Sequence, residues 1–268
     1  MNKEIKVLFL GDLVGRSGRE AVKNFLSEHR SEYDFVIANV ENASHGFGLT
    51  KKNHEELCEY GINCMTSGNH VWDKKDVFEF INESEVLIRP MNYPQSVPGV
   101  GFREFDVNDS KVVVLNLLGR TFMNPVDCPF MALENFVKTY DIQNKIVILD
   151  FHAEATAEKA CMARFALDLG LSAVLGTHTH IQTADEEILD SKLAHITDVG
   201  FCGDRGGVIG MDYKISIHRL LTSLPERFDV AKSNSSQINA VELVFDSTGL
   251  AKKISRLFLK YEEEKGED

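Results

Sequence analysis

The chain has 268 residues, of which 43% are hydrophobic and 26% charged, and its formal net charge is -12 at pH 7. This length and composition are typical of a globular protein with a sizeable core, so we expect residues 1–268 to form a single domain. The acidic surface disfavours long nucleic acids and anionic lipids as partners, although a bound metal can still create a local positive site.

Cysteine usage and the N-terminal sequence bear on the compartment. The five cysteines are scattered without a C-x-x-C pair, which is typical of reduced packing residues in a cytosolic protein. The apolar run in MNKEIKVLFLGD is too short for the core of a signal peptide, and no stretch is long and apolar enough to span a bilayer. We therefore expect a cytoplasmic protein that does not contact membranes.

Short apolar runs rich in β-branched residues predict buried strands. In chain order they are KVLFL at 6–10, DFVIANV at 34–40, INCMTS at 62–67, KVVVLNL at 111–117, KIVILD at 145–150 and SAVLGT at 172–177. Helix-like segments are found at 18–30, 50–60, 73–82 and 154–169. This alternation predicts a layered α/β architecture. Near the C-terminus, alternating residues on both sides of DSTG at 246–249 predict an antiparallel hairpin that completes a second sheet.

Residues that can bind a metal follow five of these runs. They are Asp12 after the first run, Glu41 and Asn42 after the second, Asn69 and His70 after the third, His152 after the fifth, and His178 and His180 after the last. Each alone has an ordinary structural explanation, such as a helix cap or a turn. In open α/β sheets, however, ligands bind at the carboxyl ends of strands. The joint position of these residues therefore predicts a functional cluster.

The donor types in this cluster indicate its metal chemistry. Carboxylate, carboxamide and imidazole groups together suit manganese, iron or zinc. The seven candidate ligands are Asp12, Glu41, Asn42, Asn69, His152, His178 and His180. They exceed what one octahedral ion can use while keeping a position open for water, so two ions fit better. Two such ions normally share a bridging carboxylate, for which Glu41 is the candidate. In an extended chain, His178 and His180 would point to the same face.

Two motifs, GNH at 68–70 and GTHTH at 176–180, resemble motifs of the calcineurin-like metallophosphoesterases. The chain departs from that superfamily twice: Val14 stands where Asp-x-His has its histidine, and NVENASHG at 39–46 replaces Gly-Asp-x-x-Asp. Both departures are features of one bacterial branch, the YmdB-type phosphodiesterases. The chain resembles this branch over nearly its whole length, through GDLVGRSGRE, VENASHGFGLT, SGNHVWDKK, LNLLGRTFM, DFHAEATAEK, GTHTHIQTAD and ITDVGFCGDRGGVIGMD.

The resemblance implies a four-layer α/β/β/α sandwich with a two-metal site. It also implies hydrolysis of phosphodiesters, with 2′,3′-cyclic nucleotides as the favoured small substrates. Carried over by position, one ion would take Asp12, Glu41, Asn42 and His180, and the other would take Glu41, Asn69, His152 and His178. Iron or manganese is the expected metal, with zinc as an alternative, because Val14 and Glu41 alter the ligand set of the wider superfamily.

The resemblance also implies a role for His70, since the equivalent histidine in the family is a proton donor and not a ligand. A ribose oxygen leaves poorly as an alkoxide, so a histidine beside the scissile bond can protonate it, a contribution of roughly 10²–10⁴-fold. In the expected mechanism, a hydroxide between the metals attacks phosphorus while His70 protonates the departing oxygen. The alternative is that His70 merely packs against Trp72.

Three further segments have open interpretations. The stretch GRTFMNPVDCPF at 119–130 is either a lid, with Arg120 on a phosphate and Phe122 on a base, or a packed loop. The glycine-rich stretch at 200–212 is interpreted as a turn in preference to a phosphate site. Asp198 is either a partner for a ligating imidazole or a cap.

Other functions remain open at this stage. A regulatory protein could keep the fold and metals and act through partners. Glycines in VLFLGDLVGRSG at 7–18 suggest a dinucleotide-binding oxidoreductase, but their spacing and the acidic Asp12 disfavour it. His-x-His also occurs in barrel amidohydrolases, where it normally lies in the first strand. The expected partner is a small phosphodiester or cyclic nucleotide; short RNA and assembly into a homo-oligomer are left open.

Overall fold

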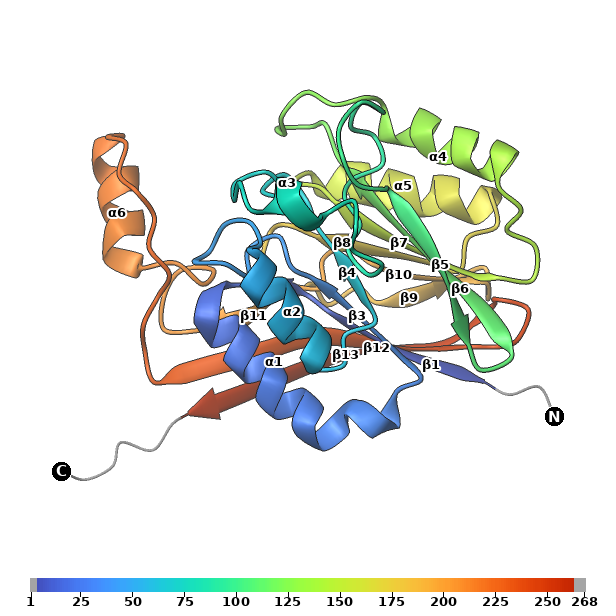
Figure 1. The fold of residues 1–268 in the computed structure, drawn as a ribbon, viewed down its shortest axis with the longest axis horizontal. Helices are drawn as coiled ribbons and strands as arrows, with labels where there is room; N and C mark the ends of the chain where they lie inside the picture. The colour runs from blue at the N-terminus through green and yellow to red at the C-terminus, as the bar shows by residue number, and fades with distance from the viewer. Residues whose placement is uncertain (1–3, 263–268) are drawn as a thin grey trace.

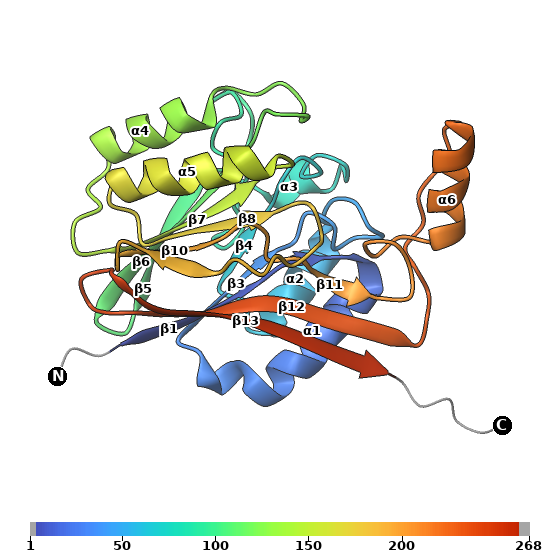
Figure 2. The ribbon, with the colours of Figure 1, turned by 180° about the vertical axis from the view of Figure 1, so that it is seen from behind.

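The computed structural model describes residues 4–262, in which two β-sheets pack face to face between two layers of helices (Figures 1 and 2). Helices α1 (Gly15–His29) and α2 (Lys51–Glu59) cover one sheet. Helices α4 (Pro129–Thr139) and α5 (Thr156–Asp168) cover the other. The four-layer α/β/β/α sandwich is therefore confirmed, and the barrel of an amidohydrolase is excluded.

The first sheet has the strand order β2-β11-β12-β1-β3-β4, with β13 also paired to β12. Its strands are β1 (Ile5–Leu10), β2 (Asp12–Leu13), β3 (Phe35–Asn39), β4 (Cys64–Thr66), β11 (Phe201–Asp204), β12 (Ser235–Phe245) and β13 (Ala251–Glu262). Strands β1, β3 and β4 are parallel, whereas β12 is antiparallel to β1.

The second sheet has the order β5-β6-β7-β8-β10-β9. Its strands are β5 (Phe102–Val107), β6 (Ser110–Leu118), β7 (Ile146–His152), β8 (Ala173–Thr177), β9 (Glu187–Leu189) and β10 (Leu193–Ile196). The four central strands are parallel, and an antiparallel strand closes each edge. All six apolar runs predicted as strands thus lie in the sheets as β1, β3, β4, β6, β7 and β8.

The core follows from the alternation of side chains along each strand. Val7 and Phe9 of β1 face the second sheet, whereas Leu8 and Leu10 face α1 and α2. The strands of the second sheet divide their residues in the same way, so apolar clusters fill all three interfaces between the layers. Because strands covered on both faces need apolar residues at every position, they appear in the sequence as continuous hydrophobic runs.

Several predicted elements need correction. Only Val77–Phe80 of the predicted helix 73–82 is helical, as α3, because successive turns occupy residues 69–76. The C-terminal hairpin forms as β12 and β13, but it joins the first sheet, because β12 pairs with every residue of β1. The glycine-rich stretch at 200–212 contains strand β11 and leads into α6 (Tyr213–Thr222), so the interpretation as a simple turn is wrong.

Helix α6 stands apart from the four layers on an arm between β11 and β12 (Figure 1). The carboxyl ends of β1, β3, β4, β7 and β8 meet near the base of this arm, where the candidate ligands lie. Among the helices of residues 4–262, none is both long and apolar enough to cross a membrane.

Candidate metal centre

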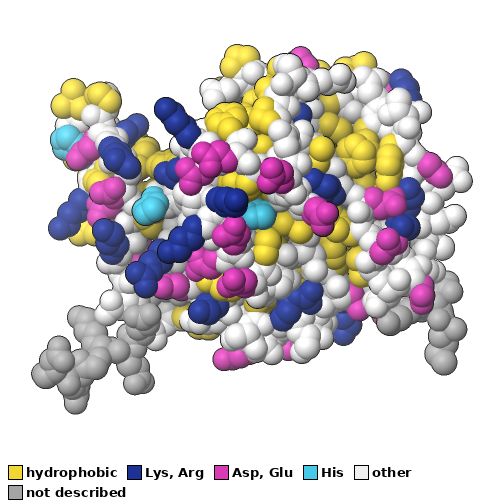
Figure 3. Space-filling model, viewed as in Figure 1, with side chains coloured by type: hydrophobic (Ala, Val, Ile, Leu, Met, Phe, Trp, Pro, Cys, Tyr) yellow, Lys and Arg dark blue, Asp and Glu magenta, His cyan; other side chains and the backbone are white. Residues whose placement is uncertain are grey.

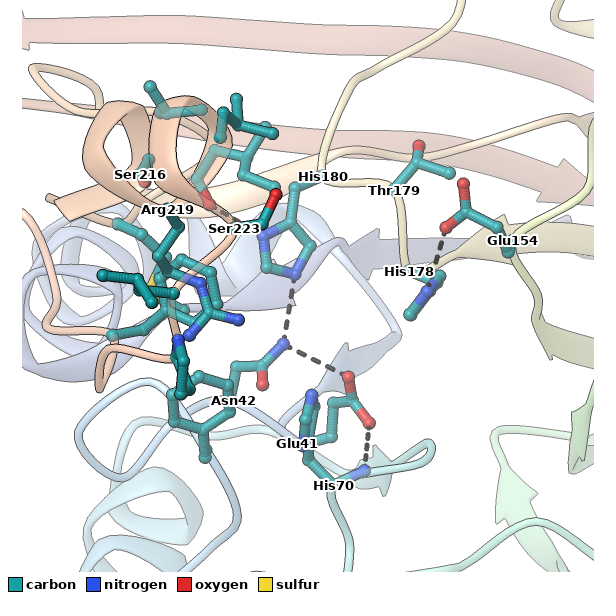
Figure 4. A pocket seen from close by; sticks show the side chains of 18 residues that line it. Glu41, Asn42, His70, Glu154, His178, Thr179, His180, Ser216, Arg219 and Ser223 are labelled. Atoms are coloured by element: carbon teal, nitrogen blue, oxygen red, sulfur yellow. Dashed lines mark hydrogen bonds and ion pairs between the residues drawn. The ribbon is translucent and has the colours of Figure 1, made fainter. Parts of the chain in front are cut away.

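The candidate ligands converge on a cavity of about 770 Å³ at the carboxyl ends of the strands (Figure 4). Its lining includes Glu41, Asn42, His70, His178 and His180. Asp12 and His152 lie fully buried below it, and Asn69 reaches the same group through His152. All eight residues predicted from the sequence are thus brought together by segments from five different strands.

The imidazole of His152 is the centre of one half of the cluster. Its Nε2 atom lies 3.1 Å from Glu41 Oε1 and 3.1 Å from Asn69 Oδ1. The Nδ1 atom of His178 is 3.0 Å from the same nitrogen. Suitable atoms of Glu41, His152 and His178 all lie within 4.8 Å of one another, as a shared metal ion requires.

Hydrogen bonds on the far side of His152 fix its orientation. The hydroxyl of Thr177 donates to Asp150 Oδ1 at 2.7 Å, so its oxygen accepts from His152 Nδ1 at 2.9 Å. Asn39 donates to the second oxygen of Asp150, and burial raises the pKa of this carboxyl to about 6. A carboxylate held in this way sets the ring orientation of a ligating histidine and leaves Nε2 directed at the cluster.

His178 is held through Nε2, whereas His152 is held through Nδ1. Its Nε2 atom lies 3.1 Å from Glu154 Oε2, a carboxylate that can only accept, so the proton belongs on Nε2 and Nδ1 carries the lone pair. Burial and the neighbouring positive charge of His152 lower the pKa of His178 to about 3. His178 is therefore a neutral imidazole with a free lone pair directed at the cluster.

The other half of the cluster contains Asp12, Asn42 and His180. His180 donates from Nδ1 to the carbonyl of Ile209 at 2.9 Å, which leaves Nε2 3.1 Å from the Asn42 amide and 3.8 Å from Asp12 Oδ1. Within residues 4–262, the buried oxygens Asp12 Oδ1 and Asn42 Oδ1 have no hydrogen-bond partner. Buried polar atoms are rarely left unsatisfied, so these two oxygens fit a site that holds a cation.

The electrostatics of the cluster also favour a bound cation. Burial opposes ionisation of Glu41, but the His152 and His70 imidazoles lower its pKa to about 2. Burial raises the pKa of Asp12. Burial likewise opposes protonation of His152, yet the surrounding carboxylates of Glu41, Asp12 and Asp150 raise its pKa to about 9. These carboxylates stabilise positive charge at His152 Nε2, and that charge can be supplied by a proton or by a metal ion.

Gly68 lies directly against Glu41 and His152. A Cβ atom at this position would overlap Glu41 Oε2 and both the Cδ2 and Nε2 atoms of His152. Glycine is therefore required in GNH because the backbone passes directly against the cluster.

His70 lies at the edge of the cavity and is not one of the converging ligands. Its backbone N–H donates to Glu41 Oε2 at 2.9 Å, and its Nδ1 lies 2.8 Å from Asp73 Oδ2. The ring packs edge-on against Phe47, while Trp72 stacks on Phe78. Asp73 thus holds the Nδ1 atom of His70, and Nε2 is the other ring nitrogen. The main ring contact of His70 is with Phe47 and not, as the alternative interpretation had it, with Trp72.

The two histidines of GTHTH are not arranged as the extended-chain argument predicts. Strand β8 ends at Thr177, and His178 and His180 have φ values of 103° and 62°. Such left-handed conformations cost roughly 1–3 kcal/mol each for residues other than glycine and persist only where the surroundings enforce them. The turn sends His178 toward His152 and His180 toward Asn42, so the pair divides between the two halves of the cluster.

A buried ion pair, which the sequence did not reveal, fixes this turn. Asp198 Oδ2 accepts from the Thr179 N–H at 3.0 Å and from Lys159 Nζ at 2.6 Å, and both side chains are buried. Asp198 Oδ1 accepts from the Gly200 N–H. Asp198 therefore positions the backbone between the two histidines and does not bond to a ligating imidazole.

We expect Lys159→Met to lower the free energy of unfolding by about 3–5 kcal/mol, because it leaves the Asp198 charge buried without its partner. Denaturant titration measures this loss. The matched control is Lys138→Met on α4, which removes an exposed pair with Glu134 and should cost about 1 kcal/mol or less. Equal effects of the two variants would contradict a structural role for the Lys159 pair.

The arm between β11 and β12 forms the outer wall of the cavity. Its contribution comes from Val208, Ile209, Met211, Ser216, Arg219, Leu220, Ser223, Leu224, Pro225 and Phe228. The proposed lid at 119–130 does not line this cavity: Arg120 is exposed, and Phe122 is 89% exposed. Its backbone is held instead by Glu158, which accepts from the N–H groups of Arg120 and Thr121.

Comparison with known proteins decides the family. The model of the YmdB-like protein family matches residues 8–257. The chain belongs to this family. A Bacillus subtilis (strain 168) relative named 2′,3′-cyclic-nucleotide 2′-phosphodiesterase is 42% identical over 257 residues, covering 95% of this chain and 97% of the relative.

Solved structures share the fold over nearly all of this chain. A hypothetical protein from Thermus thermophilus superposes with a TM-score of 0.90 at 39% identity, covering 96% of this chain and 99% of that one. A Mycoplasma pneumoniae protein described as a phosphatase gives 0.91 at 35% identity, with 98% and 96% covered. The Haemophilus influenzae NAD nucleotidase, at 10% identity and a TM-score of 0.58, shares the fold over 98% of this chain and 56% of its own.

Proposed function

We propose that this protein is a metal-dependent phosphodiesterase that hydrolyses small phosphodiesters, with 2′,3′-cyclic nucleotides as the favoured substrates. The observation that carries this proposal is the convergence of seven oxygen and nitrogen donors from five strand ends at the floor of one cavity. The name of the Bacillus subtilis relative supports the substrate class.

We assign the ligands to two ions, iron or manganese with zinc as the alternative. One ion would be held by Asp12, Glu41, Asn42 and His180, and the other by Glu41, Asn69, His152 and His178. The shared position of Glu41 is supported by its Oε1 atom, which lies 3.2 Å from Asn42 Nδ2 and 3.1 Å from His152 Nε2. When bound, the ions would activate water and neutralise charge on the phosphoryl oxygens.

His70 is assigned the transfer of a proton to the departing oxygen. Asp73 holds Nδ1, so Nε2 is the nitrogen that can deliver a proton within the cavity. Glu41 accepts the His70 backbone N–H, which ties the position of the proton donor to that of the proposed bridging ligand. His70 and Glu41 line the same cavity, so a bound diester can contact the proton donor and the metal site together.

A substrate panel tests this function. The purified protein, supplied with iron or manganese, is assayed with 2′,3′-cyclic and 3′,5′-cyclic nucleotides, short RNA and a phosphate monoester. The expected result is the highest kcat/KM with the 2′,3′-cyclic nucleotides. Preference for the monoester, or no hydrolysis of any diester, would contradict the proposal and favour a protein that acts through binding partners.

A further inference from the structure

The outer half of the cavity differs in character from the ligand cluster. It is built by the arm between β11 and β12, and most of the side chains that the arm contributes are apolar, among them Met211, Leu220, Leu224 and Phe228. Leu220 is 85% exposed and Leu224 is 59% exposed. Figure 3 shows hydrophobic side chains gathered at the outer end of this arm. An exposed apolar surface continuous with a catalytic cavity is typical of a binding site.

Arg219 introduces a cation into this apolar wall. Its guanidinium lies over the ring of Phe228, 4.1 Å from the ring centroid, and Nη1 donates to the Glu226 carbonyl. Figure 4 shows the side chain extending from α6 toward the side of the cavity that holds Asn42 and His180. In the part of the chain that the structure describes, Arg219 makes no ion pair, so no carboxylate neutralises its charge. Arg219 and Phe228 therefore place a guanidinium and an aromatic ring next to each other at the wall of the cavity.

We propose that this wall is a nucleobase subsite, in which Arg219 stacked on Phe228 contacts the base and Leu220 and Leu224 cover its apolar edge. Bases bind to proteins by stacking on aromatic rings and on guanidinium planes. The volume of about 770 Å³ leaves room for a nucleoside beside the phosphate position at the cluster. This inference rests on the proposed function, since it presumes that the diester lies at the ligand cluster.

The surroundings favour a base over two other occupants. A phosphate would be better matched by several converging donors, whereas Arg219 lies among apolar side chains and one face of its guanidinium is against Phe228. A second copy of the chain could bind the outward-facing side chains of α6, such as Leu221, which is 80% exposed and does not line the cavity, without contacting Arg219 or the cluster. The position of Arg219 and Leu220 on the cavity wall points to a ligand that also contacts the cluster.

The kinetic test compares two cyclic diesters, 2′,3′-cyclic AMP and the base-free glycerol 1,2-cyclic phosphate. We expect Arg219→Ala and Leu220→Ser to raise KM for 2′,3′-cyclic AMP by roughly tenfold, with less than a twofold change in kcat/KM for the base-free diester. Leu221→Ser, one position along the same helix, is the matched control and should leave both substrates unchanged. Equal losses on both diesters would overturn the subsite and assign Arg219 to the phosphate or to folding.

Binding of adenosine tests the subsite without catalysis. By calorimetry, the wild-type protein should bind adenosine more tightly than ribose, and Arg219→Ala should remove most of this difference. If neither diester is hydrolysed, the proposed function fails, while adenosine binding still decides the subsite. If diesters are hydrolysed but adenosine binds no better than ribose, the subsite is wrong. A change of oligomeric state in Leu220→Ser with unchanged adenosine binding would also overturn it, because a second copy would then cover the wall.

Discussion

Glu41→Gln is expected to lower kcat by roughly 10³-fold or more, because a neutral amide replaces the carboxylate assigned to both ions and the lost charge stabilisation amounts to several kcal/mol. The change keeps the size of the side chain, so the fold should persist. Steady-state kinetics with 2′,3′-cyclic AMP measure the loss of activity, and metal analysis and circular dichroism of the same sample measure the metal content and the fold.

Glu154→Gln is the matched control for this prediction. Glu154 belongs to the same cavity but is half-exposed and contacts His178 only through the outer Nε2 atom. We expect this variant to lose no more than about 10–100-fold in metal affinity, as do other groups that orient a ligating histidine. If Glu41→Gln retained full metal content and activity, the assignment of Glu41 as the bridge would be wrong.

His70→Ala is expected to slow hydrolysis of 2′,3′-cyclic AMP by roughly 10²–10⁴-fold while metal content stays unchanged. The reason is the leaving group: a ribose alkoxide needs a proton as the bond to phosphorus breaks. A diester with a p-nitrophenolate leaving group does not need this proton, so the same variant should hydrolyse bis-p-nitrophenyl phosphate at nearly the wild-type rate.

The comparison of two leaving groups separates proton transfer from other roles of His70. The exposed His45, in the loop that follows Glu41, is the matched control, and His45→Asn suits its left-handed backbone. Loss of metal in His70→Ala would make His70 a ligand, and equal slowing of both diesters would assign it to substrate positioning.

The sheets could be predicted because their strands are covered on both faces. KVVVLNL and KIVILD, for example, become β6 and β7, which lie side by side in the middle of the second sheet. The sheet that the C-terminal hairpin joins could not be predicted, because pairing between β12 and β1 depends on residues more than 200 positions apart. Local patterns carry little information on such pairings.

The candidate site was predictable to the extent that its residues follow strands. His152 and His178 could be placed at one edge from the strand ends alone, but their tautomers depend on Thr177 and Glu154, which only the folded chain brings to them. Asp150 was visible as a charge inside an apolar run, and that signal could have indicated the support for His152. The role of Arg219 could not be predicted in this way. Helix α6, which carries it, is mostly exposed and therefore contains no buried apolar run that would mark a position in the core.

Metal content tests the central claim most directly. The purified wild-type protein is analysed for iron, manganese and zinc, then depleted with a chelator and titrated with each metal while hydrolysis of 2′,3′-cyclic AMP is measured. The proposed ligand set predicts about two equivalents per chain and activity that is lost on depletion and returns with the second equivalent. Full activity in the depleted protein would contradict a metal-dependent phosphodiesterase.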